Sequence, residues 1–263
     1  MALAFDLISD LHIDTWSEPF DWTDRVTSPY CVVAGDIACD RSAVIETLAH
    51  LGRCYQAVFY IDGNDEHKYH MEDLDDSYRA LAKQLAPLKN VVYLQDNVAV
   101  VDGIAFVGTN GWWGWDFDMT VDPTESALWY QEKHNLSSDA IKRLTRMSNQ
   151  DSTYLISSVK RLQTHNDVKK IVVVTHTVPN PALIAHDISL DGSYKFNQMG
   201  NSYIGTAFAH DTERKIHTWC FGHYHGSVDQ IRNNARFVNN CRGRGDTEFC
   251  QHVYHPKRIV IDF

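Results

Sequence analysis

Phe221-Gly222-His223-Tyr224-His225-Gly226 closes an apolar run that begins at Ile216, and it carries two histidines two positions apart. In an extended backbone, side chains two positions apart point to the same side of the strand. Asp10-Leu11-His12 repeats this spacing near the N-terminus. Three more polar stretches lie between these two, and four of the five follow an apolar run that predicts a buried strand. The three are Gly35-Asp36, Gly63-Asn64-Asp65-Glu66-His67 and Thr175-His176.

The first part of the chain predicts a parallel sheet. The apolar runs at 3–9, 30–34 and 57–61 lack polar alternation, as strands that are buried on both faces do. Residues 41–52 have the period of an amphipathic helix, which we expect to end at Gly52. A strand, a helix and a second strand at this spacing form a βαβ unit with parallel strands.

The second part of the chain predicts a mixed sheet and a helical insertion. Asp102-Gly103 joins two apolar runs and is typical of a hairpin, so the sheet turns antiparallel there. Residues 110–165 begin with a cluster of tryptophans and continue in a helical pattern, which predicts an insertion. Further strands follow at 169–175, 216–221 and 258–261. We therefore expect an α/β fold with helices on both sides of the sheet strands, and residues 1–263 as one domain.

The bulk composition describes an ordinary globular protein. Hydrophobic residues make up 44% and charged residues 22% of the 263 positions, and the net charge is −10. An acidic protein is a poor partner for long nucleic acid. No run approaches the roughly 18 apolar residues of a membrane span. The start of the chain has no signal-peptide pattern, and none of the six cysteines forms a Cys-x-x-Cys pair, which predicts a cytoplasmic protein with reduced thiols.

The polar stretches together predict a metal centre. Singly, each has an ordinary explanation, such as a turn capped by Asp10 or a surface imidazole at His176. However, the carboxyl ends of parallel strands meet at one edge of a sheet, and a two-metal hydrolytic centre requires Asp, His and Asn there. Imidazoles and carboxylates that converged without a metal would leave charge poorly compensated.

This ordered set of stretches resembles the calcineurin-like metallophosphoesterase superfamily. The family pattern is Asp-x-His, Gly-Asp, Gly-Asn-His-(Asp/Glu), a later His after a strand, and Gly-His-x-His, and all five blocks occur here over residues 5–245. The hairpin, the Trp-rich turn and Asn240-Cys241-Arg242-Gly243 also resemble a bacterial branch that carries Asn-Pro-Arg-Gly there. The implied fold is a mixed β-sheet sandwich flanked by helices.

The resemblance implies two metal ions. One would be held by Asp10, His12, Asp36 and His225, and the other by Asp36, Asn64, His176 and His223, with Asp36 bridging. Nitrogen and oxygen ligands without thiolate suit Mn²⁺, Fe, Zn²⁺ or Ni²⁺. Two such ions about 3.5–4 Å apart would share a hydroxide that attacks phosphorus directly, so no protein nucleophile is needed.

The chain departs from the family pattern at Asp65, where members usually carry a histidine that protonates the leaving oxygen or contacts the phosphate. An ionised Asp is a poor proton donor at neutral pH and opposes a phosphate dianion. Either Asp65 has a raised pKa, or His67 reaches the site, or the substrate needs little acid assistance. This departure favours phosphodiesters or activated esters over simple monoesters.

The expected substrate is a small phosphorylated molecule, for example a nucleotide. Arg242, Trp112 and Trp113 are candidates to contact it, although the tryptophans could instead pack the insertion onto the body of the domain. Two alternatives remain open. The protein could bind metal in a regulatory role without catalysis, because Asp65 replaces the acid. It could also be a nuclease or nucleotide phosphatase that uses Arg242 and Arg244, and a basic rim around the pocket would favour that hypothesis.

Overall fold

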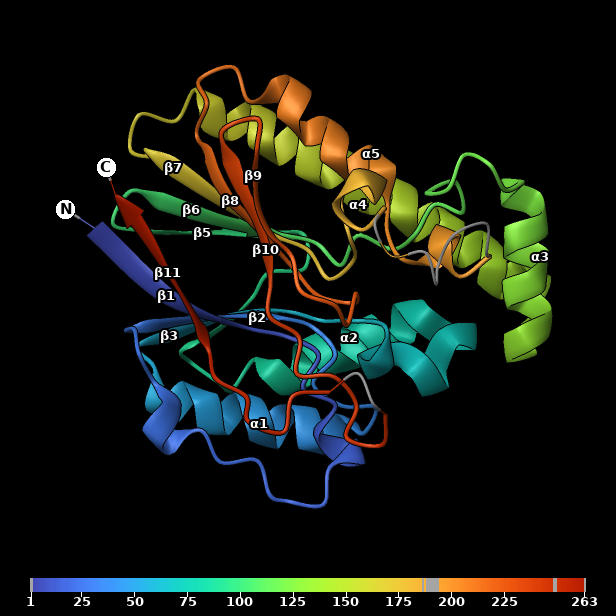
Figure 1. The fold of residues 1–263 in the computed structure, drawn as a ribbon, viewed down its shortest axis with the longest axis horizontal. Coiled ribbons are helices and arrows are strands. Elements are labelled where there is room, and N and C mark those ends of the chain that lie inside the picture. The colour runs from blue at the N-terminus through green and yellow to red at the C-terminus, as the bar shows by residue number, and fades with distance from the viewer. Residues whose placement is uncertain (1, 186, 188–193, 248–249, 263) are drawn as a thin grey trace.

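Two β-sheets face each other and carry helices on their outer sides in the computed structural model of the protein, over the residues that it describes: 2–185, 187, 194–247 and 250–262 (Figure 1). One sheet has the strand order β11-β1-β2-β3-β4 and the other β5-β6-β7-β8-β10-β9. The strands are β1 (Ala2–Ile8), β2 (Tyr30–Ala34), β3 (Ala57–Ile61), β4 (Val91–Tyr93), β5 (Asn97–Val101), β6 (Ile104–Gly108), β7 (Lys170–Val174), β8 (Ile216–Phe221), β9 (Asp229–Arg232), β10 (Ala235–Asn239) and β11 (Lys257–Asp262).

The helices lie between groups of strands along the chain. They are α1 (Arg41–Cys54), α2 (Leu74–Leu85), α3 (Pro123–His134), α4 (Ser138–Gln163) and the short α5 (Ser202–Gly205), and a 3₁₀ segment covers Asp65–Asp73. The side chain of Asp40 caps α1 by accepting a hydrogen bond from the backbone N–H of Ala43. Helix α1 continues past Gly52, so the expected end there is wrong: the backbone N–H of Tyr55 still bonds to Leu51.

Both sheets are mixed, which confirms the predicted fold class. Strands β1 to β4 pair in parallel, and β11 returns from the C-terminus to pair antiparallel with β1. In the second sheet the β5–β6 hairpin is antiparallel, with Asp102 and Gly103 both at positive φ in its turn. Strands β6, β7, β8 and β10 then pair in parallel.

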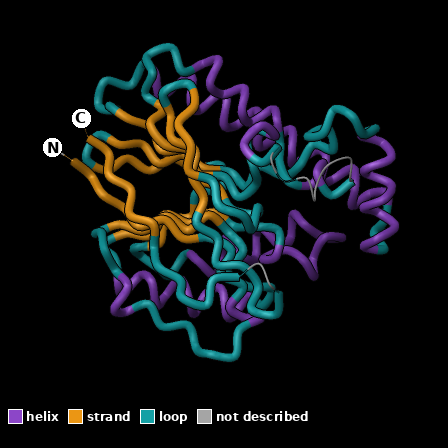
Figure 2. Tube along the Cα trace, viewed as in Figure 1, coloured by secondary structure: helices purple, strands orange, loops and turns teal. Residues whose placement is uncertain are grey.

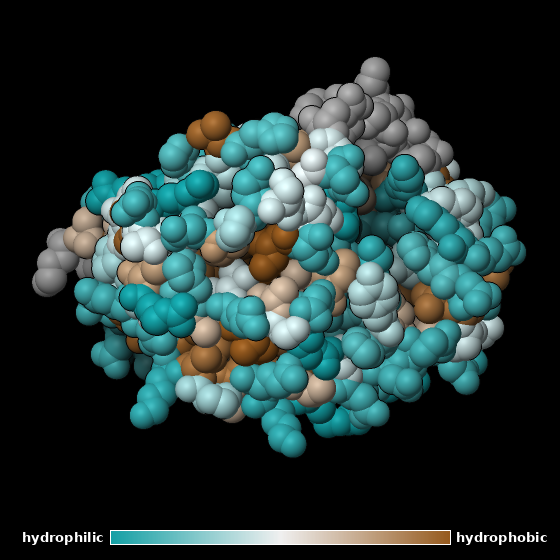
Figure 3. Space-filling model, turned by 90° about the horizontal axis from the view of Figure 1, so that it is seen from below, coloured by the Kyte–Doolittle hydropathy of each residue, from teal (hydrophilic) through white to brown (hydrophobic). Residues whose placement is uncertain are grey.

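The core lies between the two sheets. Phe59 on β3 stacks on Phe106 on β6 with ring centroids 4.0 Å apart, which ties the inner faces together. Helix α1 packs on the outer face of the first sheet, and the surface on that side is largely hydrophilic with a small central group of hydrophobic side chains (Figure 3). The strand sequences therefore lack polar–apolar alternation because both faces of the sheet are covered.

The insertion is more closely integrated than an excursion from the sheet. The second half of α4 packs Leu155, Val159 and Leu162 against the outer face of the second sheet. Its first half and α3 enclose the tryptophan cluster together with Met71 and Leu74. The insertion therefore supplies the helical layer of the second sheet as well as a wall beside the strand ends (Figure 1).

Candidate metal centre

Loops gather at the carboxyl ends of the parallel strands of both sheets (Figure 2). Strands β1, β2 and β3 lead into residues 10–12, 36 and 64–65, and strands β7 and β8 lead into residues 176 and 223–225. The structure brings all seven expected ligands together there: Asp10, His12, Asp36, Asn64, His176, His223 and His225.

One ligand group combines residues that follow β1 with a histidine that follows β8. The ligand atoms of Asp10, His12 and His225 lie within 4.8 Å of one another. The Nε2 atoms of His12 and His225 are 3.1 Å apart, and Asp10 Oδ1 lies 3.5 Å from His225 Nε2. The thiol of Cys241 and the backbone N–H of His223 also donate to Asp10 at 2.8 Å each, which fixes this carboxylate.

The other group contains Asp36, His176 and His223, again within 4.8 Å. His176 Nε2 lies 3.1 Å from Asn64 Oδ1, 3.4 Å from Asp36 Oδ1 and 3.2 Å from His223 Nδ1. The second oxygen of Asp36 lies 3.8 Å from His12 Nε2, so this carboxylate faces both groups.

The hydrogen bonds behind the imidazoles determine which nitrogen faces the centre. His176 Nδ1 lies 2.9 Å from the carbonyl of Ala34, and His223 Nε2 lies 3.0 Å from the carbonyl of Gln198. Those nitrogens carry the hydrogen, because a carbonyl only accepts. The opposite nitrogens, His176 Nε2 and His223 Nδ1, therefore present lone pairs to one another.

This donor set fits divalent metal ions. Lone pairs and carboxylate oxygens about 3 Å apart repel unless a cation lies between them, and neutral imidazole with carboxylate is a common metal-ligand set. Burial lowers the pKa of His12, and burial together with the charge of His176 lowers that of His223 to about 3. Burial and the charges of Asp65 and Asp10 raise the pKa of Asp36 well above its usual range. The concentration of buried carboxylates is therefore unfavourable by itself, and a bound cation would relieve it.

The backbone at these loops is strained. Asp10, His12, Asp36 and His223 have φ values of 50°, 43°, 55° and 65°. Left-handed backbone at non-glycine residues costs about 1 kcal/mol or more each, and it recurs at functional sites. Gly63 makes room for this arrangement, because a Cβ there would lie 2.6 Å from the backbone nitrogen of Asp36.

Asp65 joins the centre, but not as a proton donor. Its carboxylate lies 3.2 Å from His12 Nδ1 and within the group of His12 and Asp36, and it pairs with the guanidinium of Arg244. Burial alone would raise the pKa of Asp65, but the hydrogen bond with His12 and the charges of His12, Arg244 and Lys68 lower it. Of the three alternatives that the sequence left open, a raised pKa of Asp65 is therefore contradicted.

His67 does not reach the centre, so its expected catalytic position is corrected. The ring is buried, with Nε2 3.0 Å from Asp62 and Nδ1 2.8 Å from the hydroxyl of Ser77. It also stacks on Tyr78 with centroids 4.2 Å apart. Both ring nitrogens are committed to this internal network, and neither can contact a substrate.

The expected substrate contacts divide. Trp112 is fully buried and its Nε1–H donates to Tyr78, so it packs the insertion and does not line the pocket. Trp113 lines the pocket and stacks on His223 with centroids 5.8 Å apart. Arg242 lies over the Trp16 ring at 3.8 Å, outside the pocket lining, whereas Arg244 lines it. Flanking glycines in Gly243-Arg244-Gly245 were the available signal for Arg244.

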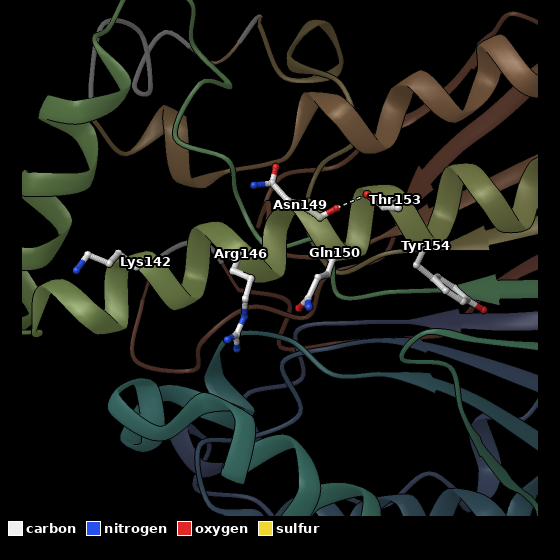
Figure 4. Close-up of a pocket in the computed structure, with 6 residues that line it drawn as sticks. All are labelled: Lys142, Arg146, Asn149, Gln150, Thr153 and Tyr154. Carbon is white, nitrogen blue, oxygen red and sulfur yellow. Dashed lines mark hydrogen bonds between the residues drawn. The ribbon is translucent and has the colours of Figure 1, made fainter.

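A cavity of about 800 Å³ opens beside the ligand groups. Its wall combines metal-centre residues such as Asp36, Asn64 and His223 with side chains of α3 and of residues 195–199. No sequence motif marked the contribution of α3. A second hollow lies along α4, between Lys142 and Tyr154, where Arg146 turns toward α2 and pairs with Asp75 at 2.7 Å (Figure 4). It contains none of the expected ligands.

Comparison with known proteins supports the fold. The chain matches no protein-family model and no curated protein sequence. Among solved structures, it resembles the phosphopantetheinyl hydrolase PptH of Mycobacterium tuberculosis at 18% identity and a TM-score of 0.66, over 91% of this chain and 89% of that one. It also resembles a Staphylococcus aureus protein assigned as a 5′-nucleotidase, at 15% identity and a TM-score of 0.53. That match covers all of this chain and 51% of the other, so this chain spans about half its length.

No helix within the described ranges combines the length and the apolar character needed to cross a membrane. The strand pairing and the likeness to solved structures together confirm the mixed, helix-flanked fold that the sequence predicts. Its strand ends converge on a cluster of carboxylates and imidazoles.

Proposed function

We propose that this protein hydrolyses phosphoesters of small molecules with the help of two divalent metal ions. The observation that carries the proposal is the pair of buried ligand groups at the strand ends, with Asp36 facing both. The named activities of the two structural neighbours, a phosphopantetheinyl hydrolase and a 5′-nucleotidase, support phosphoester chemistry on this fold.

Each part of the centre has a role in this proposal. Asp10, His12 and His225 would hold one ion, and Asn64, His176 and His223 the other, with Asp36 shared. When bound, such ions make water nucleophilic at neutral pH and neutralise charge on the phosphoryl group. The contacts of His176 with Ala34 and of His223 with Gln198 keep the coordinating nitrogens directed inward.

Arg244 and Asp65 would set the preferred ester. Arg244 places a guanidinium at the cavity wall, where it can bind phosphoryl oxygens. The contacts with His12 and Arg244 lower the pKa of Asp65, so it is a poor proton donor at neutral pH, and its charge opposes a dianion. We therefore infer a preference for monoanionic diesters or for esters with good leaving groups. Mn²⁺, Fe, Zn²⁺ and Ni²⁺ all suit the donors.

The first experiment compares a 4-nitrophenyl phosphodiester with 4-nitrophenyl phosphate in the presence of Mn²⁺. We expect turnover of the diester to exceed that of the monoester, and His225→Ala to lower it by at least a hundredfold. The control His165→Ala changes an exposed histidine in the turn after α4 and should behave as wild type. No turnover of either ester by a protein that binds Mn²⁺ would overturn the proposal in favour of the non-catalytic alternative.

The role of Asp65 has its own test. Asp65→His restores an imidazole next to Asn64 and removes the negative charge, so we expect the ratio of monoester to diester turnover to rise. A variant that binds metal normally but gains no monoesterase activity would contradict the explanation of ester preference.

The nuclease alternative gains one observation, because Lys133, Lys195 and Arg244 line the cavity. These cations line one cavity, whereas a nucleic-acid backbone requires a longer positively charged groove. Cleavage of a single-stranded oligonucleotide at a rate above that of the small diester would favour the nuclease.

A further inference from the structure

Two lysines and a histidine from separate segments line the same cavity. Lys133 and His134 end α3, and Lys195 precedes the 3₁₀ segment Phe196–Gln198; all three line the cavity that also contains Asp36 and His223. Neither lysine makes an ion pair with any residue that the structure describes, although the protein carries a net charge of −10. The cations are therefore not explained by internal pairing.

The surrounding contacts hold these side chains in place. Lys133 Nζ lies 4.4 Å from the centroid of the Trp129 ring, and the His134 ring lies 4.2 Å from that of Tyr130. Tyr194 packs beside Trp129 at 5.8 Å and its hydroxyl bonds to Glu125 on α3 at 3.2 Å. Tyr194 therefore lies against α3, and Lys195 follows it in the chain.

The two lysine charges repel one another, and nearby lysines disfavour the protonated form of His134. Burial and the charge of Lys195 lower the pKa of Lys133, and burial and the charges of Lys133 and Lys68 lower that of His134. Like charges that are held together in an acidic protein are characteristic of an anion-binding site. Among the described residues that line the cavity, the carboxylates are Asp36 of the ligand cluster and Asp187, which accepts a hydrogen bond from Tyr224 at 3.2 Å.

We propose that Lys133 and Lys195, with the His134 ring beside them as a hydrogen-bond donor, form a second anion subsite, so that the preferred substrate carries another phosphate or carboxylate beyond the phosphoester that the metal centre takes. The inference rests on the proposed function, since it assigns the scissile phosphoryl group to the ligand cluster. A cavity of about 800 Å³ has room for a molecule with both groups.

A series of substrates tests the subsite. We would use 4-nitrophenyl alkyl phosphodiesters whose alkyl chains end in methyl, carboxylate or phosphate. Wild type should show a kcat/KM about tenfold higher for the substrates with an anionic end than for the methyl-ended substrate. This is the gain in affinity expected from two exposed charge contacts. Comparison of the carboxylate-ended and phosphate-ended substrates shows whether the subsite binds anions in general or is selective for phosphate.

Variants locate the effect. In Lys133→Gln/Lys195→Gln we expect the advantage of the anionic ends to disappear, while turnover of the methyl-ended diester changes less than twofold. The control Lys83→Gln/Lys89→Gln makes the same change of charge at exposed lysines of the α2 region and should keep the advantage. Equal losses for all three esters, or no advantage in wild type, would overturn the subsite.

Binding separates this inference from the proposed function. With Mn²⁺ present, calorimetry should find an alkane bisphosphonate of matching length bound about tenfold more tightly than the alkyl monophosphonate, and Lys133→Gln/Lys195→Gln should abolish the difference. If no ester is hydrolysed but this difference is found, the proposed function fails and the subsite stands. Equal affinities for the two phosphonates would refute the subsite whatever the turnover.

Discussion

Glu66 connects the two loops that carry Asp36 and Asn64. Its Oε2 accepts hydrogen bonds from the backbone N–H groups of Asp36 at 3.1 Å and Gly63 at 2.7 Å, and its Oε1 accepts one from Ile37 at 2.7 Å. The side chain is buried and touches no substrate-accessible wall that we identify. It acts as a positioning residue for ligands from two neighbouring strands.

Glu66→Gln should destabilise the protein and weaken metal binding. One accepting oxygen becomes an NH₂ group that faces backbone donors, which leaves them unsatisfied at a cost of about 2 kcal/mol. Urea unfolding in the presence of a chelator measures this loss, and Mn²⁺ titration measures the affinity. Glu46→Gln makes the same change on the exposed side of α1 and should stay within about 0.5 kcal/mol of wild type. Wild-type stability and affinity in Glu66→Gln would contradict this role.

Individual residues also show what the sequence could predict about the site. The convergence of seven residues could be predicted because each follows a strand at a fixed place in a motif: Asp10, His12, Asp36, Asn64, His176, His223 and His225. The neighbours of Asp65 could not be predicted, because its pairing with Arg244 joins positions 179 residues apart. His67 was misplaced because a 3₁₀ turn, which sequence spacing does not reveal, directs its ring to Asp62.

At the scale of elements, Asp229 ties together strands from both sheets. On β9, it accepts hydrogen bonds from Arg236 on β10 at 2.7 and 2.8 Å and from Lys257 on β11 at 3.0 Å. Strand β11 belongs to the first sheet and β9 and β10 to the second. The edges of the two sheets therefore share one carboxylate.

This contact predicts a pH dependence. The hydrogen bond from Arg236 outweighs burial and, with Lys257, lowers the pKa of Asp229 to about 2 from an ordinary 3.8. The folded-state pKa is depressed, so the stabilisation is complete above the ordinary value and is lost as pH falls through about 2. At pH 7, Asp229→Asn should cost about 1 kcal/mol or less, because these side chains remain roughly one third exposed.

Urea unfolding of wild type and Asp229→Asn between pH 7 and pH 2 measures the contribution. The difference in unfolding free energy should shrink toward zero at the acid end, and the exposed substitution Asp24→Asn should give no such trend. A difference that stays constant with pH would exclude the ion pair as its source.

Strands were the most predictable elements, because apolar runs such as 30–34 and 57–61 are long enough to identify alone. Strand β9 (Asp229–Arg232) was missed, since its sequence is polar and it pairs only at an edge. The place of α4 was also missed. Its period predicts a helix, but packing along a second sheet depends on the division of strands into two layers, which local sequence does not encode.

At the scale of the whole molecule, each ligand group combines residues from both sheets. Asp10 and His12 follow β1 of the first sheet, whereas His225 follows β8 of the second; Asp36 likewise meets His176 and His223. A bound ion would therefore join the two layers, and its binding free energy would add to the stability of the entire fold.

Metal removal should lower the thermal stability of the protein. Free Mn²⁺ at 100 times its Kd should add about 2.7 kcal/mol to the unfolding free energy, and EDTA should remove that gain. Differential scanning calorimetry with each addition measures the shift in Tm. His225→Ala should lose most of the shift and His165→Ala should keep it. A Tm that does not respond to millimolar Mn²⁺ would contradict the metal centre itself.

The division of the ligands between the sheets also constrains how a newly made chain matures. Asp10, His12, Asp36 and Asn64 leave the ribosome first, and His223 and His225 follow only after about 160 further residues, roughly ten to thirty seconds at 5–20 residues per second. During that interval the nascent chain lacks His225 of one ligand group and His223 of the other. An ion captured early would stay exchangeable, and metal could be retained only once the last parallel strands had joined the sheet.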